Sequence, residues 1–244
     1  MKIAVIGAGI FGITSALKLK EAGHIVEIFE EQNSILTSAS RCNQYRLHRG
    51  YHYPRSVEMI QDCSDFEEFY KPAIVDRGFD RYYAIAKEDS LTSVDGYLSF
   101  LEQNRLKYQI IPQLNLLKNE NVDLIVKVQE NSFDSGDLYL TCVKLLREAK
   151  IPVKCGVKFT NKMISEFDIV VNCTYSNLNQ FLPENEQVDY QFELCEKPVI
   201  SIGKEWQRKS VVIMDGEFCC IDPLGNDGYY HLLGHVKEAI HERY

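Results

Sequence analysis

Apolar and polar residues follow one another along the first thirty positions in the order strand, turn, helix, strand. The apolar run over residues 2–6 predicts a short β-strand. The segment Gly7–Gly12 comes directly after it, and residues 13–22 then carry apolar side chains at helical spacing. A second apolar run over residues 25–29 predicts the next strand, which is followed by Glu30. This order is typical of the first β-α-β unit of a dinucleotide-binding domain.

The middle of the chain does not continue this β-α-β order. The pattern predicts helices over residues 56–70 and 93–106 and short strands over residues 79–86, 108–111 and 124–128. A helix beginning at Asp134 and apolar runs over residues 151–157 and 168–174 then predict a return to a parallel sheet. Later short apolar runs separated by turns predict antiparallel strands. The predicted fold class is α/β, with a Rossmann-like nucleotide-binding domain interrupted by an α+β lobe.

Three glycines and one acidic residue of the first unit suit a dinucleotide. Gly7 allows the tight turn, Gly9 lets a pyrophosphate approach the backbone, and Gly12 lets the helix pack close to the sheet. The helix N-terminus offers N–H groups and a partial positive charge to the phosphates. Glu30 is placed to accept hydrogen bonds from the adenosine ribose. The candidate cofactor-binding residues of the turn are Gly7, Ala8, Gly9, Ile10, Phe11 and Gly12.

The composition narrows the possible partners. The chain of 244 residues is 45% hydrophobic and 25% charged, which is ordinary for a globular protein, and it carries a net charge of −8. An acidic surface disfavours nucleic acid and anionic membranes, and no apolar run approaches the roughly 20 residues of a membrane span. The first strand begins at residue 2, which predicts no signal peptide. We expect a cytoplasmic protein with a small-molecule substrate, and the sequence leaves its oligomeric state open.

The cysteines predict no disulfide framework. The chain has eight cysteines, and none of them forms a C-x-x-C pair. Several lie in apolar runs that resemble strands, such as Cys173 in the run 168–174. We expect reduced, buried thiols.

The stretch Tyr45–Arg55 is unusually dense in basic and aromatic side chains. If it is extended, one face carries Arg46, His48, Gly50 and His52. Such a face is a poor core strand and a plausible wall of a binding site. A zinc pair of His48 and His52 on a helix is disfavoured by Gly50 between them and by Pro54. A solvated loop without a function is the other open interpretation.

The glycine turn with Glu30, residues 38–53 and the predicted strand 168–174 together resemble one enzyme family. They are similar to the FAD-dependent oxidoreductases of the D-amino-acid oxidase type, which include glycine oxidase, sarcosine oxidase and L-2-hydroxyglutarate oxidase. The local match is nearest to the last of these, whose loop reads roughly N-S-x-x-x-H-x-G-x-Y-Y. Residues 43–53 read N-Q-Y-R-L-H-R-G-Y-H-Y here.

The resemblance implies FAD as the cofactor and a discontinuous domain arrangement. It implies an FAD-binding Rossmann-like domain over residues 1–75 and 134–182, and an antiparallel-sheet substrate domain over residues 76–133 and 183–244. It places His48 and Gly50 next to the isoalloxazine. The further residues that it places at the FAD are Ser38, Ser40, Asn43, Val157, Cys173 and Thr174.

Two departures from the family pattern matter. Tyr175 stands where the family usually has a glycine after the strand end. Family members are also longer, and their C-terminal part returns once more to the flavin. We therefore expect that the chain is truncated at its C-terminus.

The predicted function is oxidation of a C–H bond next to an amine or hydroxyl of a small carboxylate-bearing substrate, with hydride transfer to the flavin. The catalytic candidates come from the basic and aromatic stretch. Arg46 or Arg55 would hold the carboxylate, and His48 or His52 would accept the proton. The alternatives are an NAD-binding dehydrogenase or reductase, which has the same glycine turn, and a truncated relative that binds a nucleotide without catalysis.

Overall fold

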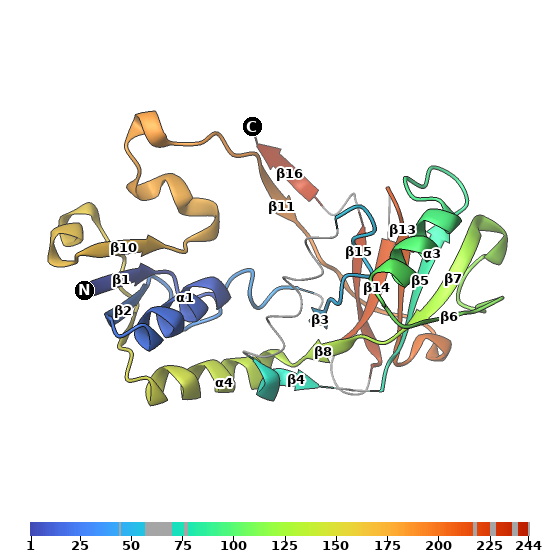
Figure 1. Cartoon of the computed structure of the whole chain (residues 1–244), viewed down its shortest axis with the longest axis horizontal. Coiled ribbons are helices and arrows are strands. Elements are labelled where there is room, and N and C mark those ends of the chain that lie inside the picture. Colours follow the sequence, from blue (N-terminus) through green and yellow to red (C-terminus); the bar gives the residue numbers. More distant parts are fainter. Residues whose placement is uncertain are drawn as a thin grey trace. The chain divides into compact units, whose positions relative to one another are not determined.

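The computed structural model describes residues 1–43, 45–56, 70–75, 78–216, 219–224, 228–235 and 239–243. Residues 57–69 of the predicted helix 56–70 therefore lie outside the described residues. The chain forms two compact units (Figure 1). The first, called here the parallel-sheet unit, comprises Met1–Asn43, Ser135–Phe192 and Glu242–Tyr244. The second, the mixed-sheet unit, comprises Gln44–Asp134 and Glu193–His241. The first boundary lies near residue 43, whereas the domain prediction has it at 75.

The parallel-sheet unit contains the predicted β-α-β unit. Its four strands lie in the order β10-β1-β2-β9, and all neighbours are parallel. Their bounds are Lys2–Ile6 for β1, Ile25–Glu30 for β2, Val153–Cys155 for β9 and Ile169–Asn172 for β10. The chain thus returns at β10 to pair with its first strand, as the pattern of residues 168–174 predicts.

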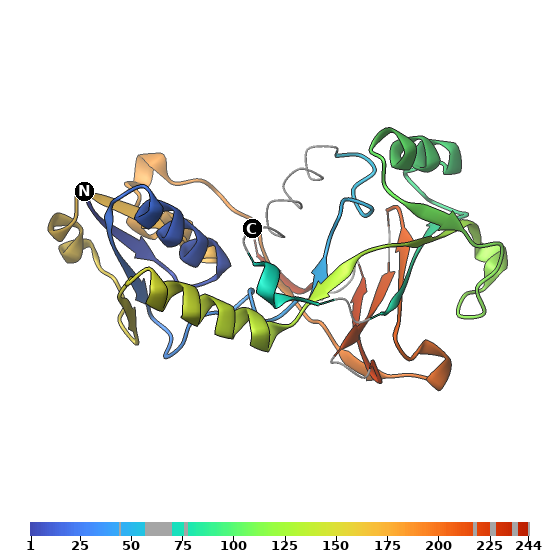
Figure 2. The same ribbon diagram turned by 60° about the horizontal axis from the view of Figure 1, so that its bottom comes forward.

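Each face of this sheet is covered. Helix α1 (Ile10–Glu21) buries Ile13, Ala16 and Leu17, which recur at helical spacing, and it connects β1 to β2. Helix α4 (Ser135–Glu148) packs beside α1 (Figure 2). Alternate side chains of β1 and β2 form a separate cluster with Phe159, which follows β9; its strand members are Ala4, Ile6 and Phe29. The 3-10 helices of the unit are η3 (Asn161–Glu166), η4 (Tyr175–Phe181) and η5 (Glu184–Glu186).

The mixed-sheet unit is built on seven strands in the order β12-β15-β14-β13-β5-β7-β6. Their bounds are Asp80–Ala86 for β5, Tyr108–Ile110 for β6, Val122–Val128 for β7, Val199–Ser201 for β12, Lys209–Met214 for β13, Cys219–Leu224 for β14 and Tyr230–His235 for β15. All neighbours are antiparallel except β13 and β5, which are parallel. The predicted antiparallel-sheet lobe is therefore confirmed, with one parallel pair, because β5 and β13 are joined by a long connection and not by a hairpin.

Helix α3 (Val94–Gln103) covers one face of this sheet. Its buried side chains Tyr97, Phe100 and Leu101 belong to the same cluster as Tyr83 of β5. The hydroxyl of Ser93 caps the helix by accepting a hydrogen bond from the Gly96 N–H at 3.1 Å. The remaining 3-10 helices are η1 (Lys71–Ala73), η2 (Asn119–Asn121) and η6 (Lys204–Trp206).

Most of the basic and aromatic stretch is not a strand. Only β3 (Arg46–Leu47) is extended, and it joins a three-stranded sheet with β8 (Asn131–Phe133) and β4 (Ile74–Val75). The prediction of one extended face through residue 52 is wrong, because Gly50 adopts a φ of 99° and the Tyr53 N–H donates to the Gly50 carbonyl at 2.9 Å. Strands β11 (Phe192–Cys195) and β16 (Ala239–Arg243) form a further two-stranded sheet. Within the described part of the chain, every helix is too short or too polar to cross a bilayer.

Candidate functional site

The turn between β1 and α1 has no room for side chains at two of its glycines. A Cβ atom added to Gly7, which has a φ of 95°, would lie 2.6 Å from the carbonyl oxygen of Cys173. A Cβ atom added to Gly12 would lie 1.9 Å from the carbonyl oxygen of Gly7. At Gly9 the added atom would meet only Ser40 Oγ, at 3.3 Å. The backbone is therefore packed tightly at Gly7 and Gly12 and is open at Gly9.

The start of α1 presents backbone N–H groups at this turn. Gly9 is the N-cap residue and its extended conformation begins the helix without a side-chain cap. The N–H groups of the first turn have no acceptor inside the helix. The Ile10 N–H donates to Ser40 Oγ at 3.0 Å, which ties the loop of residues 38–43 to the helix end. The turn is therefore suited to an anion.

Glu30 is held by backbone N–H groups at the end of β2. Its Oε2 accepts a hydrogen bond from the Ala8 N–H at 2.7 Å, and its Oε1 accepts one from the Gln32 N–H at 2.8 Å. A carboxylate oxygen accepts more than one hydrogen bond, so both oxygens can also accept from ligand hydroxyls. The backbone of the glycine turn thus fixes the position of the Glu30 carboxylate, so a ligand bound at the turn would lie close to this carboxylate.

A pocket of about 420 Å³ opens at the turn, within the parallel-sheet unit. This volume lies in the range of small-molecule sites. The predicted cofactor residues that line it are Gly7, Gly9, Ile10, Phe11, Glu30, Ser38, Ser40, Asn43, Val157, Cys173 and Thr174. Ala8 and Gly12 are buried beside it and do not line it. The structure thus brings segments from five parts of the chain to one pocket.

Other lining residues were not predicted. They are Ile6, Phe29, Glu31, Gln32, Ala39, Lys158, Phe159, Tyr175, Ser176, Asn177 and Gln180. Most of them come directly after the ends of β2, β9 or β10. The carboxyl ends of parallel strands lie at one edge of a sheet. The residues that follow each predicted strand could therefore have been included in the predicted site.

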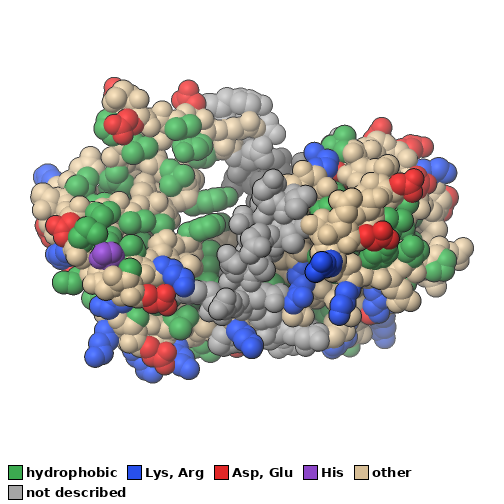
Figure 3. Space-filling view, in the orientation of Figure 1, with side chains coloured by type: hydrophobic (Ala, Val, Ile, Leu, Met, Phe, Trp, Pro, Cys, Tyr) green, Lys and Arg blue, Asp and Glu red, His purple; other side chains and the backbone are tan. Residues whose placement is uncertain are grey.

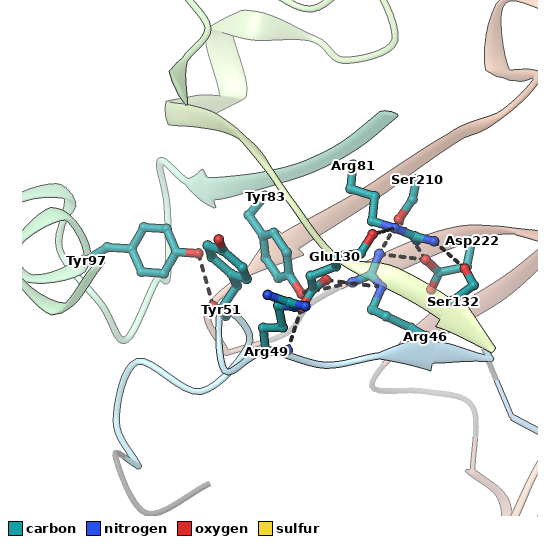
Figure 4. Close-up of polar contacts among 10 residues, drawn as sticks. All are labelled: Arg46, Arg49, Tyr51, Arg81, Tyr83, Tyr97, Glu130, Ser132, Ser210 and Asp222. Atoms are coloured by element: carbon teal, nitrogen blue, oxygen red, sulfur yellow. Dashed lines mark hydrogen bonds and ion pairs between the residues drawn. The ribbon is translucent and has the colours of Figure 1, made fainter. Parts of the chain in front are cut away.

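The mixed-sheet unit contains a buried network of charges around Arg46 (Figure 4). Arg46 is 6% exposed. Its Nη2 donates to Asp222 Oδ1 at 2.6 Å and also to the hydroxyl of Ser210, and its Nη1 donates to the Tyr83 hydroxyl at 3.0 Å. Its Nε lies 3.7 Å from Glu130 Oε2. Burial lowers the pKa of Arg46, but the charge of Asp222 and the other acidic groups outweighs it and raises the pKa well above its usual value.

A second arginine completes this network. The Nε of Arg81 donates to the Glu130 carbonyl at 2.8 Å, and its Nη2 donates to the hydroxyl of Ser132. Burial, together with the charge of Arg46, lowers the pKa of Arg81. The Glu130 carboxylate accepts hydrogen bonds from the Tyr83 hydroxyl and the Arg49 N–H, each at 3.0 Å. The buried guanidinium groups of Arg46 and Arg81 thus lie beside the buried carboxylates of Glu130 and Asp222. The contacts of Arg46 given above are all to side chains of the protein itself.

The candidate catalytic histidines also lie in the mixed-sheet unit. The ring centroids of His48 and His52 are 5.6 Å apart, and both rings are close to Tyr53. Burial and the charge of Arg46 lower the pKa of His48 to about 4. Burial, His48 and Arg46 lower the pKa of His52 to about 4. Both imidazoles are therefore uncharged at neutral pH. In the described part of the chain, no three His, Cys, Asp or Glu side chains gather as metal ligands would.

Gly50 and Arg55 lie near these histidines in the sequence and have different surroundings. Gly50 is buried. Arg55 has a side chain that is 61% exposed, and its Nε donates to Asp215 Oδ2 at 2.8 Å. Asp215 also accepts from the Thr92 hydroxyl at 2.7 Å. Of the two arginines predicted to hold a substrate carboxylate, Arg55 is the one that solvent reaches.

We expect the free energy of unfolding to fall as the pH is lowered from about 6.5 to about 4. In the unfolded chain His48 and His52 take up protons near the ordinary pKa of 6.5, whereas in the folded chain they do so near 4. Acid therefore favours the unfolded state over this interval and no further below it. Urea unfolding at a series of pH values measures the slope. The double variant H48N/H52N should have a shallower slope, and an unchanged slope would contradict the assignment.

The sequence matches a protein family and several curated relatives. A family model described as FAD dependent oxidoreductase matches residues 2–149. The chain is 30% identical to the FAD-dependent monooxygenase FPY4 of Fusarium mangiferae, over 99% of this chain and 68% of that protein. It is 27% identical to the FAD-dependent monooxygenase kojA of Aspergillus flavus, over 91% of this chain. The alignment with kojA covers 58% of the length of that relative.

The fold is similar to those of solved oxidase and dehydrogenase structures. Glycine oxidase from Geobacillus kaustophilus superposes with a TM-score of 0.71 at 14% identity, over 96% of this chain and 70% of that one. L-Proline dehydrogenase from P. horikoshii superposes with a TM-score of 0.64 at 16% identity, over 99% of this chain and 70% of that one. These likenesses agree with the mixed α/β architecture. Because the family model covers more than half of the chain, the protein belongs to the FAD dependent oxidoreductase family, whose cofactor is FAD.

Proposed function

We propose that the pocket of the parallel-sheet unit binds FAD and that the protein is a flavin-dependent oxidoreductase. The observation that carries the proposal is the pocket itself, which has the open backbone of Gly9 on one side and the fixed carboxylate of Glu30 on the other. In this proposal the N–H groups at the start of α1 hold the pyrophosphate, Glu30 holds the adenosine ribose, and Val157 lies at the adenine.

The residues of the pocket suit this cofactor in charge and in space. A side chain at Gly9 would project toward Ser40, so the missing Cβ atom leaves the backbone accessible to a phosphate. The carboxylate of Glu30 favours the hydroxyls of a ribose and repels a 2′-phosphate. Ser38 and Asn43 add polar groups to the lining on the side of the loop 38–43.

The proposed reaction oxidises a C–H bond next to an amine or hydroxyl of a small carboxylate-bearing substrate. FAD supplies the hydride acceptor of this chemistry when it is bound. We assign the substrate carboxylate to Arg55, because its guanidinium is exposed, whereas that of Arg46 is buried and paired with Asp222. His48 or His52 would accept the substrate proton, and the uncharged state of both rings at neutral pH is the state that a proton acceptor needs.

An absorption spectrum with a cofactor titration tests the proposal. The purified chain should bind FAD, with flavin bands that are released on denaturation. NADH serves as the comparison ligand, because an NAD-binding dehydrogenase would have a similar glycine turn. A protein that binds NADH and not FAD would be an NAD-binding enzyme, and one that binds neither would contradict the proposal. If FAD binds, candidate amino and hydroxy acids are then screened for bleaching of the flavin.

Replacing Glu30 with alanine is expected to weaken FAD binding about tenfold to hundredfold. The change removes an ionised acceptor of ribose hydrogen bonds, which are worth about 1.5–3 kcal/mol. Glu27→Ala is the matched control, because Glu27 lies on the same strand and pairs with Lys2 and Lys154 away from the pocket. Equilibrium titration with FAD measures both variants. Equal affinity of E30A and E27A would show that Glu30 does not contact the cofactor.

A further inference from the structure

Two aromatic side chains of the pocket lie largely in solvent. Phe11 is 75% exposed and Tyr175 is 74% exposed, although both line the pocket. In contrast, Phe29 and Phe159, which also line it, are each 2% exposed. The space-filling view shows hydrophobic side chains at the surface of the parallel-sheet unit (Figure 3). Exposed aromatic rings in a ligand pocket provide an apolar surface on which a planar ligand can stack.

Tyr175 occupies a backbone conformation that is unfavourable for its side chain. Its φ is 57°, in the left-handed region that glycine adopts readily. The resemblance to the oxidase family places a glycine at this position. This chain therefore keeps a large ring at a place where a smaller residue would be less strained. Strained residues of this kind cluster at ligand sites.

Phe11 and Tyr175 both belong to segments beside the glycine turn, and Cys173 lies where these two segments meet. A Cβ atom added to Gly12, the residue after Phe11, would lie 3.5 Å from Cys173 Cβ. Tyr175 follows Cys173 by two residues, and the Cys173 N–H donates to the Ile6 carbonyl at 2.8 Å. Phe11 thus belongs to the turn where the pyrophosphate is proposed to bind, and Tyr175 follows the strand end beside that turn.

The order of the strands separates Tyr175 from the adenosine end. The sheet order is β10-β1-β2-β9. Tyr175 comes after β10 at one edge, whereas Glu30 ends β2 and Val157 follows β9 at the other edge. A dinucleotide that has its ribose at Glu30 and its pyrophosphate at the turn of β1 continues toward β10. The half of FAD that reaches Tyr175 is then the riboflavin half.

We infer that Tyr175 contacts the riboflavin half of FAD at the pocket and makes the pocket bind FAD more tightly than ADP. This inference rests on the proposed binding of FAD at this pocket. It assigns Tyr175 as a specificity residue that acts through ring contact, in a position that the family usually gives to glycine.

The variant Tyr175→Gly tests the inference in the whole chain. Its dissociation constant for FAD should rise about tenfold, which corresponds to the loss of one aromatic contact. Its dissociation constant for ADP should stay within about twofold of the wild-type value. The melting temperature without ligand should be unchanged or higher, because glycine relieves the left-handed conformation. A change that weakens the ligand while sparing the fold is not expected of a merely structural residue.

Two further variants complete the experiment. Lys150→Gly is the matched control, because Lys150 is exposed in the same unit, has a φ of 54° and does not line the pocket. It should affect neither ligand, whereas Phe11→Ala, at the turn proposed for the pyrophosphate, should weaken FAD and ADP equally. If wild type binds both ligands and Y175G loses affinity for both equally or for neither, the assignment of the ring to the riboflavin half is overturned. If wild type binds neither FAD nor ADP, the proposed function itself is overturned.

Discussion

Replacing Asp222 with alanine is expected to destabilise the protein by about 3–5 kcal/mol, the cost of removing one partner of a buried ion pair. Asp222 is 2% exposed, and its Oδ1 accepts hydrogen bonds from Arg46 and, at 2.7 Å, from Ser210. The variant leaves the positive charge of Arg46 in the interior without that carboxylate. Urea unfolding, followed through the transition of the mixed-sheet unit, measures the loss.

An exposed ion pair of the same sheet is the control for this prediction. Lys127 Nζ lies 2.5 Å from Asp80 Oδ1, and the two side chains are 40% and 41% exposed. Asp80→Ala should cost at most about 1 kcal/mol, because water screens the pair. The double variant R46M/D222L should be less unstable than the sum of its single variants, since it removes both charges together. Equal losses for D222A and D80A would contradict the role of burial.

Replacing Gly12 with alanine is expected to abolish retention of FAD and to destabilise the protein by about 3 kcal/mol, at the upper end of the range for overpacking. The new Cβ atom would lie 1.9 Å from the Gly7 carbonyl oxygen, which belongs to rigid backbone. Helix α1 must then move away from β1, and the first-turn N–H groups move with it. Gel filtration with FAD and thermal unfolding measure the two effects.

Gly23→Ala separates this clash from ordinary backbone strain. Gly23 follows α1 and has a φ of 85°, and a Cβ atom there would meet nothing within 4 Å. The control should cost about 1 kcal/mol and leave FAD binding intact. If G12A binds FAD as well as G23A does, the close packing of the helix on the turn is not required for the site.

The local parts of the pocket were predictable from the sequence. Gly7, Gly9 and Glu30 lie within one β-α-β unit, so their spacing alone relates them to each other. The pairing of Arg46 with Asp222 was not predictable, because 176 positions separate the two residues and only the mixed sheet brings them together. A charge within an apolar run, such as Asp222 in β14, needs a partner when it is buried, but its position in the sequence does not identify that partner.

The stretch Tyr45–Arg55 shows how far residue type alone can be used. Its clustering of arginine and histidine predicts a wall of a binding site, which stays a prediction, and the extended conformation that one shared face requires is interrupted at Gly50. The residues that contact Arg46 lie on other strands, so the pattern of side chains along residues 45–55 carries no information about them. Arg46 is buried and pairs with Asp222, whereas Arg55 remains at the surface.

The pairing of β1 with β10 has a consequence for the order in which the protein is completed on the ribosome. β1 is an inner strand, and Ile3 pairs with Ile169 on one side of it. Until the segment near residue 170 has been synthesised, the glycine turn lacks the neighbour that Cys173 supplies. The glycine turn is therefore completed only after β10 has been synthesised, and in the proposed function FAD can bind the nascent chain only after that point.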